Sequence, residues 1–305
     1  MKNISLPAAV ALTLVLLAAP PAFSRTRRVG NPANALKSMY TPSYLSLKAA
    51  VLEELKGART GRFAEDVSGL RRDTSPKRKV IALTFDACGG HKSGYNAELI
   101  DYLRRERLRA TLFVTGIWIE RNRETFLELA RDPLFEIENH GLLHRVCSVT
   151  GRSKYGVLPT RDMGDVIDEM ELNSRKIQEL TGRRPAFFRP ATAFADEASV
   201  RVAERLGMEL VNYEVLSGDA MRASVGTMTR NLIRGAGKGS VVIMHFHRPE
   251  WGEVAALKAA VPVLRARGYT FDKLKNLPAA PAARGGRIGR RGKRAGAVRM
   301  NGERL

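Results

Sequence analysis

Short apolar runs alternate with longer amphipathic segments between about residue 79 and about residue 271 of this chain. The short runs have the composition of buried strands, and the longer segments repeat apolar residues at helical spacing. The predicted strands are residues 79–86, 110–115, 135–139, 186–188, 209–213, 240–245 and 269–271. The predicted helices are residues 95–107, 120–131, 161–180, 196–206, 225–234 and 253–267.

About seven strand–helix repeats in one series indicate an α/β domain with a parallel sheet. We expect a closed or nearly closed (β/α)7–8 barrel, with an open doubly wound sheet as the alternative. Both architectures place functional side chains at the carboxyl ends of strands. The loop after the first strand, Ala87 to His91, lacks the spacing of a phosphate-binding loop, so nucleotide binding is not expected.

The two ends of the chain depart from this pattern. Residues 1–24 have one early lysine, an apolar run and small residues near the end, which is typical of a secretory signal peptide. Residues 25–78 form an N-terminal extension with one helix predicted over 43–56, and the strand–helix domain covers 79–277. We expect a periplasmic or secreted protein with no transmembrane segment after signal cleavage.

The net charge is +20, and part of it lies in a basic tail, residues 278–305, which has few apolar side chains and is predicted to be disordered. A second basic stretch, residues 71–79, leads into the first strand. In an exported protein this charge favours an anionic envelope polymer as partner, although the tail could equally be a solubilising extension. Export argues against a nucleic-acid partner.

The chain has two cysteines, Cys88 and Cys147, each shortly after a segment with candidate chemistry. An oxidising compartment would allow a disulfide between them, provided that their loops are neighbours. We therefore carry the Cys88–Cys147 bridge as a hypothesis.

The candidate chemistry centres on His140 and His144, two of only five histidines. Their spacing would put both imidazoles on one side of a single helical turn, which is half of a divalent-metal site. Asp86 and His245 end two predicted apolar strands, so both are expected at the same rim of the barrel. An acid, a histidine pair and a lone histidine form the skeleton of a hydrolytic site.

The chain resembles the polysaccharide deacetylase family, the NodB-homology group of carbohydrate esterases, over roughly residues 79–274. The matching motifs are Thr84-Phe85-Asp86, Asn139 to His144, Phe188-Arg189-Pro190, Gly218-Asp219 and Val242 to His245. The resemblance implies a distorted (β/α) barrel and metal-dependent removal of N-acetyl, occasionally O-acetyl, groups from glycans.

By the same resemblance, Asp86 is the catalytic base, and Arg189 orients it. His245 is the general acid, and Asp219 keeps it protonated. His140 and His144 are metal ligands, with zinc as the expected metal.

The chain departs from the family at Ala87, where a second Asp usually completes the metal triad. Candidate replacements are His91, Asn96, the Cys88 thiolate or Asp86 itself, and a thiolate would favour zinc. We predict a hydrolase that deacetylates an envelope or extracellular glycan. The alternatives are a metal-independent cyclic amide hydrolase of the same fold and a non-catalytic glycan-binding pseudoenzyme.

Overall fold

The computed structural model describes residues 38–90 and 93–279. The chain divides into two compact units, Met1–Thr41 and Pro42–Leu305, and the second contains the sheet with its covering helices. The predicted signal peptide and the basic tail lie outside the described residues. No helix in the described part of the chain is long and apolar enough to span a bilayer.

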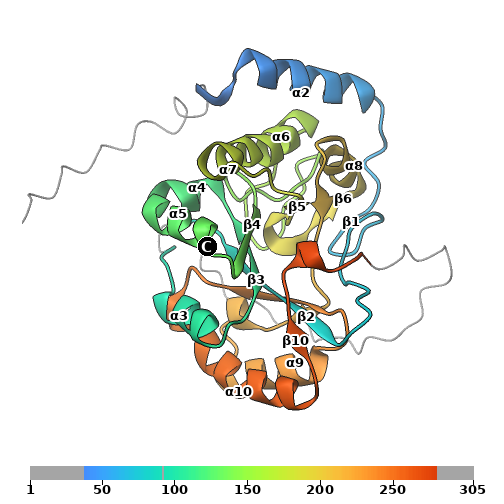
Figure 1. Ribbon diagram of the computed structural model, residues 1–305. Helices are drawn as coiled ribbons and strands as arrows, with labels where there is room; N and C mark the ends of the chain where they lie inside the picture. The colour runs from blue at the N-terminus through green and yellow to red at the C-terminus, as the bar shows by residue number, and fades with distance from the viewer. Residues whose placement is uncertain (1–37, 91–92, 280–305) are drawn as a thin grey trace, which may run out of the picture. The chain divides into compact units, whose positions relative to one another are not determined.

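The second unit is built on one curled sheet of parallel strands (Figure 1). The strands lie in the order β7-β5-β4-β3-β2-β9-β8, and β10 also pairs with β2. Their bounds are β2 Val80–Ala87, β3 Ala110–Val114, β4 Phe135–Asn139, β5 Phe187–Phe188, β7 Glu209–Leu210, β8 Val215–Leu216, β9 Val241–His245 and β10 Thr270–Phe271. Within the described residues β7 and β8 do not pair with each other, so the sheet is an incomplete barrel. The predicted distorted barrel is thereby confirmed.

Helices cover the outer face of this sheet (Figure 1). They are α3 Ala97–Arg105, α4 Gly116–Arg121, α5 Arg123–Arg131, α6 Met163–Ile167, α7 Asn173–Thr181, α8 Glu197–Arg205, α9 Val225–Gly235 and α10 Glu253–Ala266. The helix predicted over 120–131 is broken at Asn122 into α4 and α5. The one predicted over 161–180 is interrupted by a π-helical segment, Asp168–Leu172.

The sequence pattern missed three short strands. One is β8, and the other two, β1 Phe63–Ala64 and β6 Ala195–Asp196, form a separate antiparallel pair. Two-residue strands carry too few positions for an apolar run or an alternation to be recognised.

Side chains alternate between two apolar clusters along β2. Ile81, Leu83, Phe85 and Ala87 belong to the large cluster shared with α3, α5, α9 and α10. Val80 and Ala82 belong to a second cluster that comes mainly from strands and loops, on the concave face of the sheet. The strand is therefore buried on both sides, and its even-numbered residues face the interior of the barrel.

Residues of the N-terminal extension line the gap in the barrel. Arg71 forms a parallel bridge with Val211 just beyond β7, and Asp73 forms an antiparallel bridge with Ser240 just before β9. The buried Arg71 guanidinium also donates to the carbonyl of Leu277 at 2.8 Å. This basic residue thus ties the two ends of the strand–helix region together.

The helix predicted over 43–56 is α2, Pro42–Glu54, and it packs on the strand–helix region through Tyr44. Tyr44 is fully buried, and its hydroxyl hydrogen-bonds the carboxylate of Asp168. Lys48 binds the same carboxylate at 2.6 Å. One aromatic side chain and one shared carboxylate therefore anchor this helix.

We predict that Tyr44→Ala lowers the free energy of unfolding by about 3 kcal/mol, because it leaves a cavity where a buried aromatic ring was. Leu45→Ala is the control, since Leu45 is 48% exposed on the same helix. Urea unfolding of both variants measures the difference. Equal, small losses would show that α2 is not anchored through Tyr44.

Candidate active site

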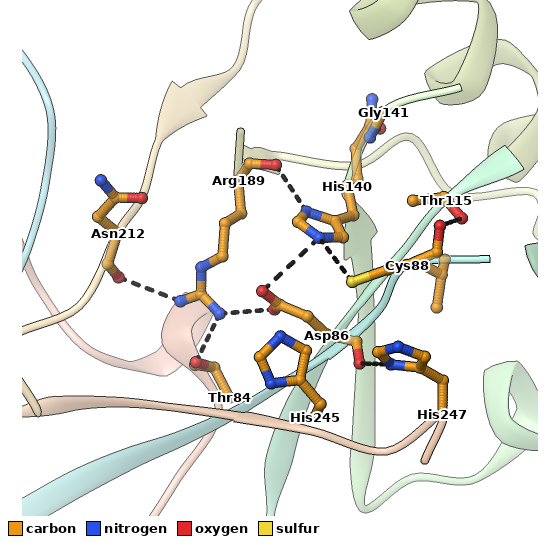
Figure 2. Close-up of polar contacts among 12 residues, drawn as sticks. Thr84, Asp86, Cys88, Thr115, His140, Gly141, Arg189, Asn212, His245 and His247 are labelled. Atoms are coloured by element: carbon orange, nitrogen blue, oxygen red, sulfur yellow. Dashed lines mark hydrogen bonds and ion pairs between the residues drawn. The ribbon is translucent and has the colours of Figure 1, made fainter. Parts of the chain in front are cut away.

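Five strands bring the predicted site residues to one edge of the sheet, and Figure 2 shows Asp86, His140, Arg189 and His245 there. Asp86 of β2 lies directly opposite His245 of β9 in the parallel register. His140 follows β4, and Arg189 follows β5, which pairs with β4 through Asn139 and Phe188. Asp219 lies just beyond β8, the other neighbour of β9. The carboxyl ends of these strands meet as the barrel topology requires.

Arg189 and Asp86 form a buried ion pair. The Nη1 of Arg189 donates to Asp86 Oδ1 at 2.8 Å and to Thr84 Oγ1 at 2.8 Å. Its Nη2 and Nε donate to the carbonyls of Asn212 and Val211 at 3.1 and 3.3 Å. Arg189 is fully buried, and its guanidinium lies 4.2 Å from the ring centroid of Phe113. These contacts fix the orientation of the Asp86 carboxylate.

Asp219 and His245 form the second acid–histidine pair. Asp219 Oδ2 accepts from the backbone N–H of His245 at 2.6 Å and from its Nδ1 at 3.2 Å. Burial disfavours the imidazolium, but the carboxylate of Asp219 raises the pKa of His245 well above its ordinary value. The same partner lowers the pKa of Asp219 despite burial. The pairing with Asp219 therefore favours the protonated ring of His245.

His140 and His144 face each other, but the expectation of one helical turn is wrong. The segment between them is an irregular loop, in which Gly141 and His144 have φ values of +93° and +58°. The bends bring the two rings to a centroid separation of 5.0 Å. His140 Nδ1 donates to the carbonyl of Arg189 at 2.8 Å, so the neutral ring has its lone pair on Nε2.

A buried carboxylate that sequence reasoning missed holds this histidine loop in place. Glu169, in the π-helical segment, accepts from the backbone N–H groups of Leu143 and Arg145 at 3.0 and 2.9 Å. A Cβ on Gly141 would lie 2.3 Å from Glu169 Oε1, so this close approach requires glycine. Glu169 lies among other acidic residues, Asp165, Asp168 and Glu171, so the sequence carried no signal that set it apart.

Cys88 contributes a third donor beside the two histidines. Its Sγ lies 3.8 Å from His140 Nε2, and one donor atom from each of Cys88, His140 and His144 lies within 4.8 Å of the other two. Burial opposes ionisation of the thiol, but the imidazoles of His144 and His247 lower its pKa well below the usual value. The structure therefore contains a Cys/His cluster that could hold a metal ion.

Two other expectations about the third ligand and the cysteines can now be judged. Cys88 and Cys147 are both free, so the proposed disulfide is wrong. Cys88 faces the histidines, whereas Cys147 is buried with its sulfur 4.0 Å from the carbonyl of Arg145. His91 lies outside the described residues, and Asn96 caps α3 by accepting from the N–H of Leu99.

The loop after β9 adds a histidine that the motifs did not assign. His247 is buried, and its Nδ1 donates to the backbone carbonyl of Asp86 at 3.1 Å. Trp251 packs against both His245 and His247, with ring centroids 5.5 Å apart in each case. Since Trp251 is only 8% exposed, it supports the site from behind rather than presenting its face to a sugar.

Comparison with known proteins agrees with this arrangement. A family model described as polysaccharide deacetylase matches residues 73–211. A peptidoglycan-N-acetylglucosamine deacetylase of Bacillus cereus is 26% identical over 202 residues, which are 65% of this chain and 88% of the relative. The peptidoglycan-N-acetylmuramic acid deacetylase PdaA of Bacillus subtilis is 26% identical over 205 residues, covering 66% of this chain and 72% of the relative.

Solved structures share the fold. The Bc1960 peptidoglycan N-acetylglucosamine deacetylase superposes with a TM-score of 0.59 at 22% identity, covering 69% of this chain and 92% of its own. The wild-type BA3943 protein of Bacillus anthracis, described as a carbohydrate esterase family 4 pseudoenzyme, gives a TM-score of 0.57 at 20% identity and covers 76% and 81%. In its motifs, sheet and histidine pair, the chain is similar to the polysaccharide deacetylase family.

Glu253, at the start of α10, generates a prediction about stability and pH. Its side chain is buried, and neither carboxyl oxygen has a hydrogen-bond partner among the described residues. Burial, with the nearby Asp219 carboxylate, raises its pKa to about 8. A carboxyl group with a raised pKa in the folded state favours folding fully only below its unfolded pKa, and that contribution is lost as the pH rises through about 8.

We expect Glu253→Gln to leave the unfolding free energy nearly unchanged at about pH 5 and to raise it by on the order of 3 kcal/mol above about pH 8. Thermal denaturation at both pH values tests this. Glu250→Gln, an exposed carboxylate in the same loop, is the control and should show no such pH-dependent gain. A gain of equal size at both pH values would contradict the prediction.

Proposed function

We propose that this protein is a metal-dependent N-deacetylase that acts outside the cytoplasm on N-acetylated peptidoglycan or a related envelope glycan. The observation that carries the proposal is the convergence of two oriented acid–base pairs on the histidine loop. Asp86 is paired with Arg189, and His245 with Asp219, on adjacent strands. The named activities of the Bacillus relatives supply the substrate class.

Asp86 is proposed as the general base for the attacking water. Its Oδ1 is occupied by Arg189, whereas its Oδ2 is turned toward the His140 side, 3.7 Å from Nε2 of that ring. A carboxylate held at one oxygen has the other free to accept a proton. General-base catalysis by such a group contributes roughly 100- to 10,000-fold to the rate.

His245 is proposed as the general acid. Because Asp219 accepts at Nδ1, the remaining ring nitrogen carries the proton that the departing amine needs. The amine of the deacetylated sugar is a poor leaving group unless protonated, so the raised pKa of His245 suits this role. Asp86 and His245 pair directly in the register of β2 and β9, which supports a base and an acid that act on the same bond.

His140 and His144 are proposed as metal ligands, with zinc as the metal. The donor set fits, because His140 is locked by Arg189 in the tautomer that leaves Nε2 free, and such support through the other ring nitrogen is usual for ligating histidines. The chemistry supplied by a divalent cation held there is polarisation of the acetamide carbonyl and acidification of the attacking water.

One specific observation favours a second candidate, a non-catalytic glycan-binding protein. Ala87 provides no metal ligand, and the BA3943 pseudoenzyme has the same fold. A pure binder, however, has no need of buried Arg–Asp and Asp–His pairs. Burying such charged groups costs desolvation free energy, and a catalytic role accounts for keeping them. Acetate release from acetylated peptidoglycan, measured with the purified protein, separates the two candidates.

We predict that Asp86→Asn lowers kcat for acetate release by about 100- to 10,000-fold, because the general base is lost. Zinc content, measured by mass spectrometry of the purified protein, should stay near that of the unchanged protein. Asp101→Asn, an exposed carboxylate on α3, should leave both quantities unaltered. Loss of zinc with Asp86→Asn would instead make Asp86 a ligand.

Removal of the metal should stop turnover reversibly. Dialysis against a chelator is expected to abolish acetate release, and added zinc should restore it. His140→Ala should bind no zinc and show no restoration, because a ligand is missing. Activity that survives chelation would instead favour a metal-independent amide hydrolase of the same fold.

The basic tail is proposed to attach the protein to an anionic envelope polymer. The support is composition alone, since arginines dominate residues 280–305 and exposed charge attracts anionic surfaces. Periplasmic or secreted location is proposed on the sequence features of residues 1–24. Both proposals concern segments outside the described residues.

Truncation after Ala279 should weaken adsorption to anionic envelope fragments in a salt-dependent way while leaving turnover of soluble substrates intact. This end point keeps the Pro278 carbonyl, which accepts from the N–H of Ser75 at 2.9 Å. Sedimentation with envelope fragments at low and high salt measures the effect. Unchanged adsorption would remove the tail from the proposal.

A further inference from the structure

The metal site proposed above lacks a third protein ligand at Ala87, and the structure offers one at the next position. We propose that the Cys88 thiolate, with His140 and His144, completes the metal site of this protein as a sulfur–nitrogen–nitrogen set. The inference rests on the proposed function only in that it concerns the same metal ion. It assigns Cys88 a ligand role in place of a carboxylate.

Strand alternation selects Cys88 over Ala87. The odd-numbered residues of β2, ending with Ala87, point into the apolar cluster beneath the helices. The even-numbered series runs from Val80 and Ala82 to Asp86 on the interior face, and Cys88 continues it. The thiol therefore projects to the same side as the Asp86 carboxylate.

The backbone of Cys88 is held by contacts on both sides. Thr115 Oγ1 donates to the Cys88 carbonyl at 3.1 Å, and the N–H of Gly89 donates to Ser93 Oγ at 3.0 Å. Arg121 Nη1 donates to the Gly89 carbonyl at 2.7 Å. Gly89 has a φ of +86°, and a Cβ there would lie 2.4 Å from Ile117, so the turn requires glycine. These contacts hold the backbone that carries the thiol.

The donor spacing matches that of a tetrahedral metal ion. Zn–S and Zn–N bonds of about 2.3 and 2.0 Å place a sulfur and a nitrogen ligand about 3.5 Å apart in a tetrahedral site. The observed separation of Cys88 Sγ and His140 Nε2 is 3.8 Å. His144 completes the set within 4.8 Å (Figure 2 shows the thiol directed at His140). Small side-chain rotations would bring all three donors onto one ion.

The neighbouring groups of Cys88 are those of a ligand rather than of a packing residue. Cys147, the other cysteine, is fully buried, and no imidazole surrounds it among its described contacts. Cys88 is partly exposed and has His140 and His144 within reach. The chain therefore supplies its own matched control for any thiol measurement.

A thiolate ligand changes which metal the site selects. Sulfur ligands favour zinc and cobalt(II) over magnesium, manganese or calcium, which prefer oxygen. The site should consequently prefer soft metal ions over hard ones. Chemical modification of the Cys88 thiol should release the bound metal.

The test is cobalt(II) substitution of the full-length, metal-stripped protein. The unchanged protein and Cys147→Ser should bind one equivalent and show thiolate-to-cobalt charge-transfer absorption in the near ultraviolet. Cys88→Ser should lack this absorption and bind zinc at least about 100-fold more weakly, a loss at the upper end of that seen when a ligand's supporting partner is removed. Circular dichroism checks that each variant is folded.

A second measurement needs no variant. Bound zinc should protect Cys88 from iodoacetamide, read by peptide mass spectrometry, and alkylation of the metal-stripped protein should abolish zinc binding. Because Cys147 is buried, its alkylation would report only on unfolding of the protein.

The proposal is overturned if cobalt binds without charge-transfer absorption, if Cys88→Ser keeps the absorption and the affinity, or if the unchanged protein binds no cobalt. Its failure can be told apart from failure of the proposed function. Chelator-sensitive acetate release without a thiolate signal supports the proposed deacetylase but rules out Cys88 as a ligand. A thiolate signal without acetate release from any acetylated glycan supports Cys88 as a ligand but rules out the proposed deacetylase.

Discussion

The buried ion pair between Arg189 and Asp86 is the interaction on which the whole site depends. Both side chains are almost completely removed from water, and removing one partner of such a pair typically costs about 3–5 kcal/mol because the other charge is left uncompensated. The guanidinium also donates hydrogen bonds to Thr84 and to two backbone carbonyls beyond β7. One residue thus joins β2, β5 and the segment after β7.

Arg189 also orients His140, one of the proposed metal ligands. The carbonyl of Arg189 accepts from His140 Nδ1, while its guanidinium holds Asp86. The two contacts couple the tautomer of a proposed metal ligand to the orientation of the proposed base. A displacement of the loop after β5 would therefore disturb both contacts at once.

Histidines gather around Cys88. His140, His144, His245 and His247 are four of the five histidines in the chain, and all act on the Cys88 thiol or share its electrostatic surroundings. Ala87 fits this picture, because the position that faces the helices needs a small apolar side chain and the next one faces the histidines. The lack of a carboxylate at Ala87 and the presence of a thiol at Cys88 thus follow from the same alternation of side chains along β2.

The sequence by itself determined the parallel α/β fold, the long strands and the residues at the rim. Asp86, His140 and His245 could be placed there because each lies at or just after the carboxyl end of a buried strand whose direction the repeat fixes. Short strands such as β8 and the break at Asn122 could not be predicted, because two residues or one cap leave no periodic signal.

The tertiary structure alone decided how the histidine pair is built and which cysteine belongs to it. An i, i+4 spacing suggests a helical turn, but Glu169, 26 residues after Leu143, accepts from the backbone N–H groups of Leu143 and Arg145 and holds this segment as a loop. Cys88 faces imidazoles rather than Cys147 because β2 alternation and the contacts of Thr115 and Arg121 direct it there. Such contacts join residues distant in the chain, and no local pattern encodes them.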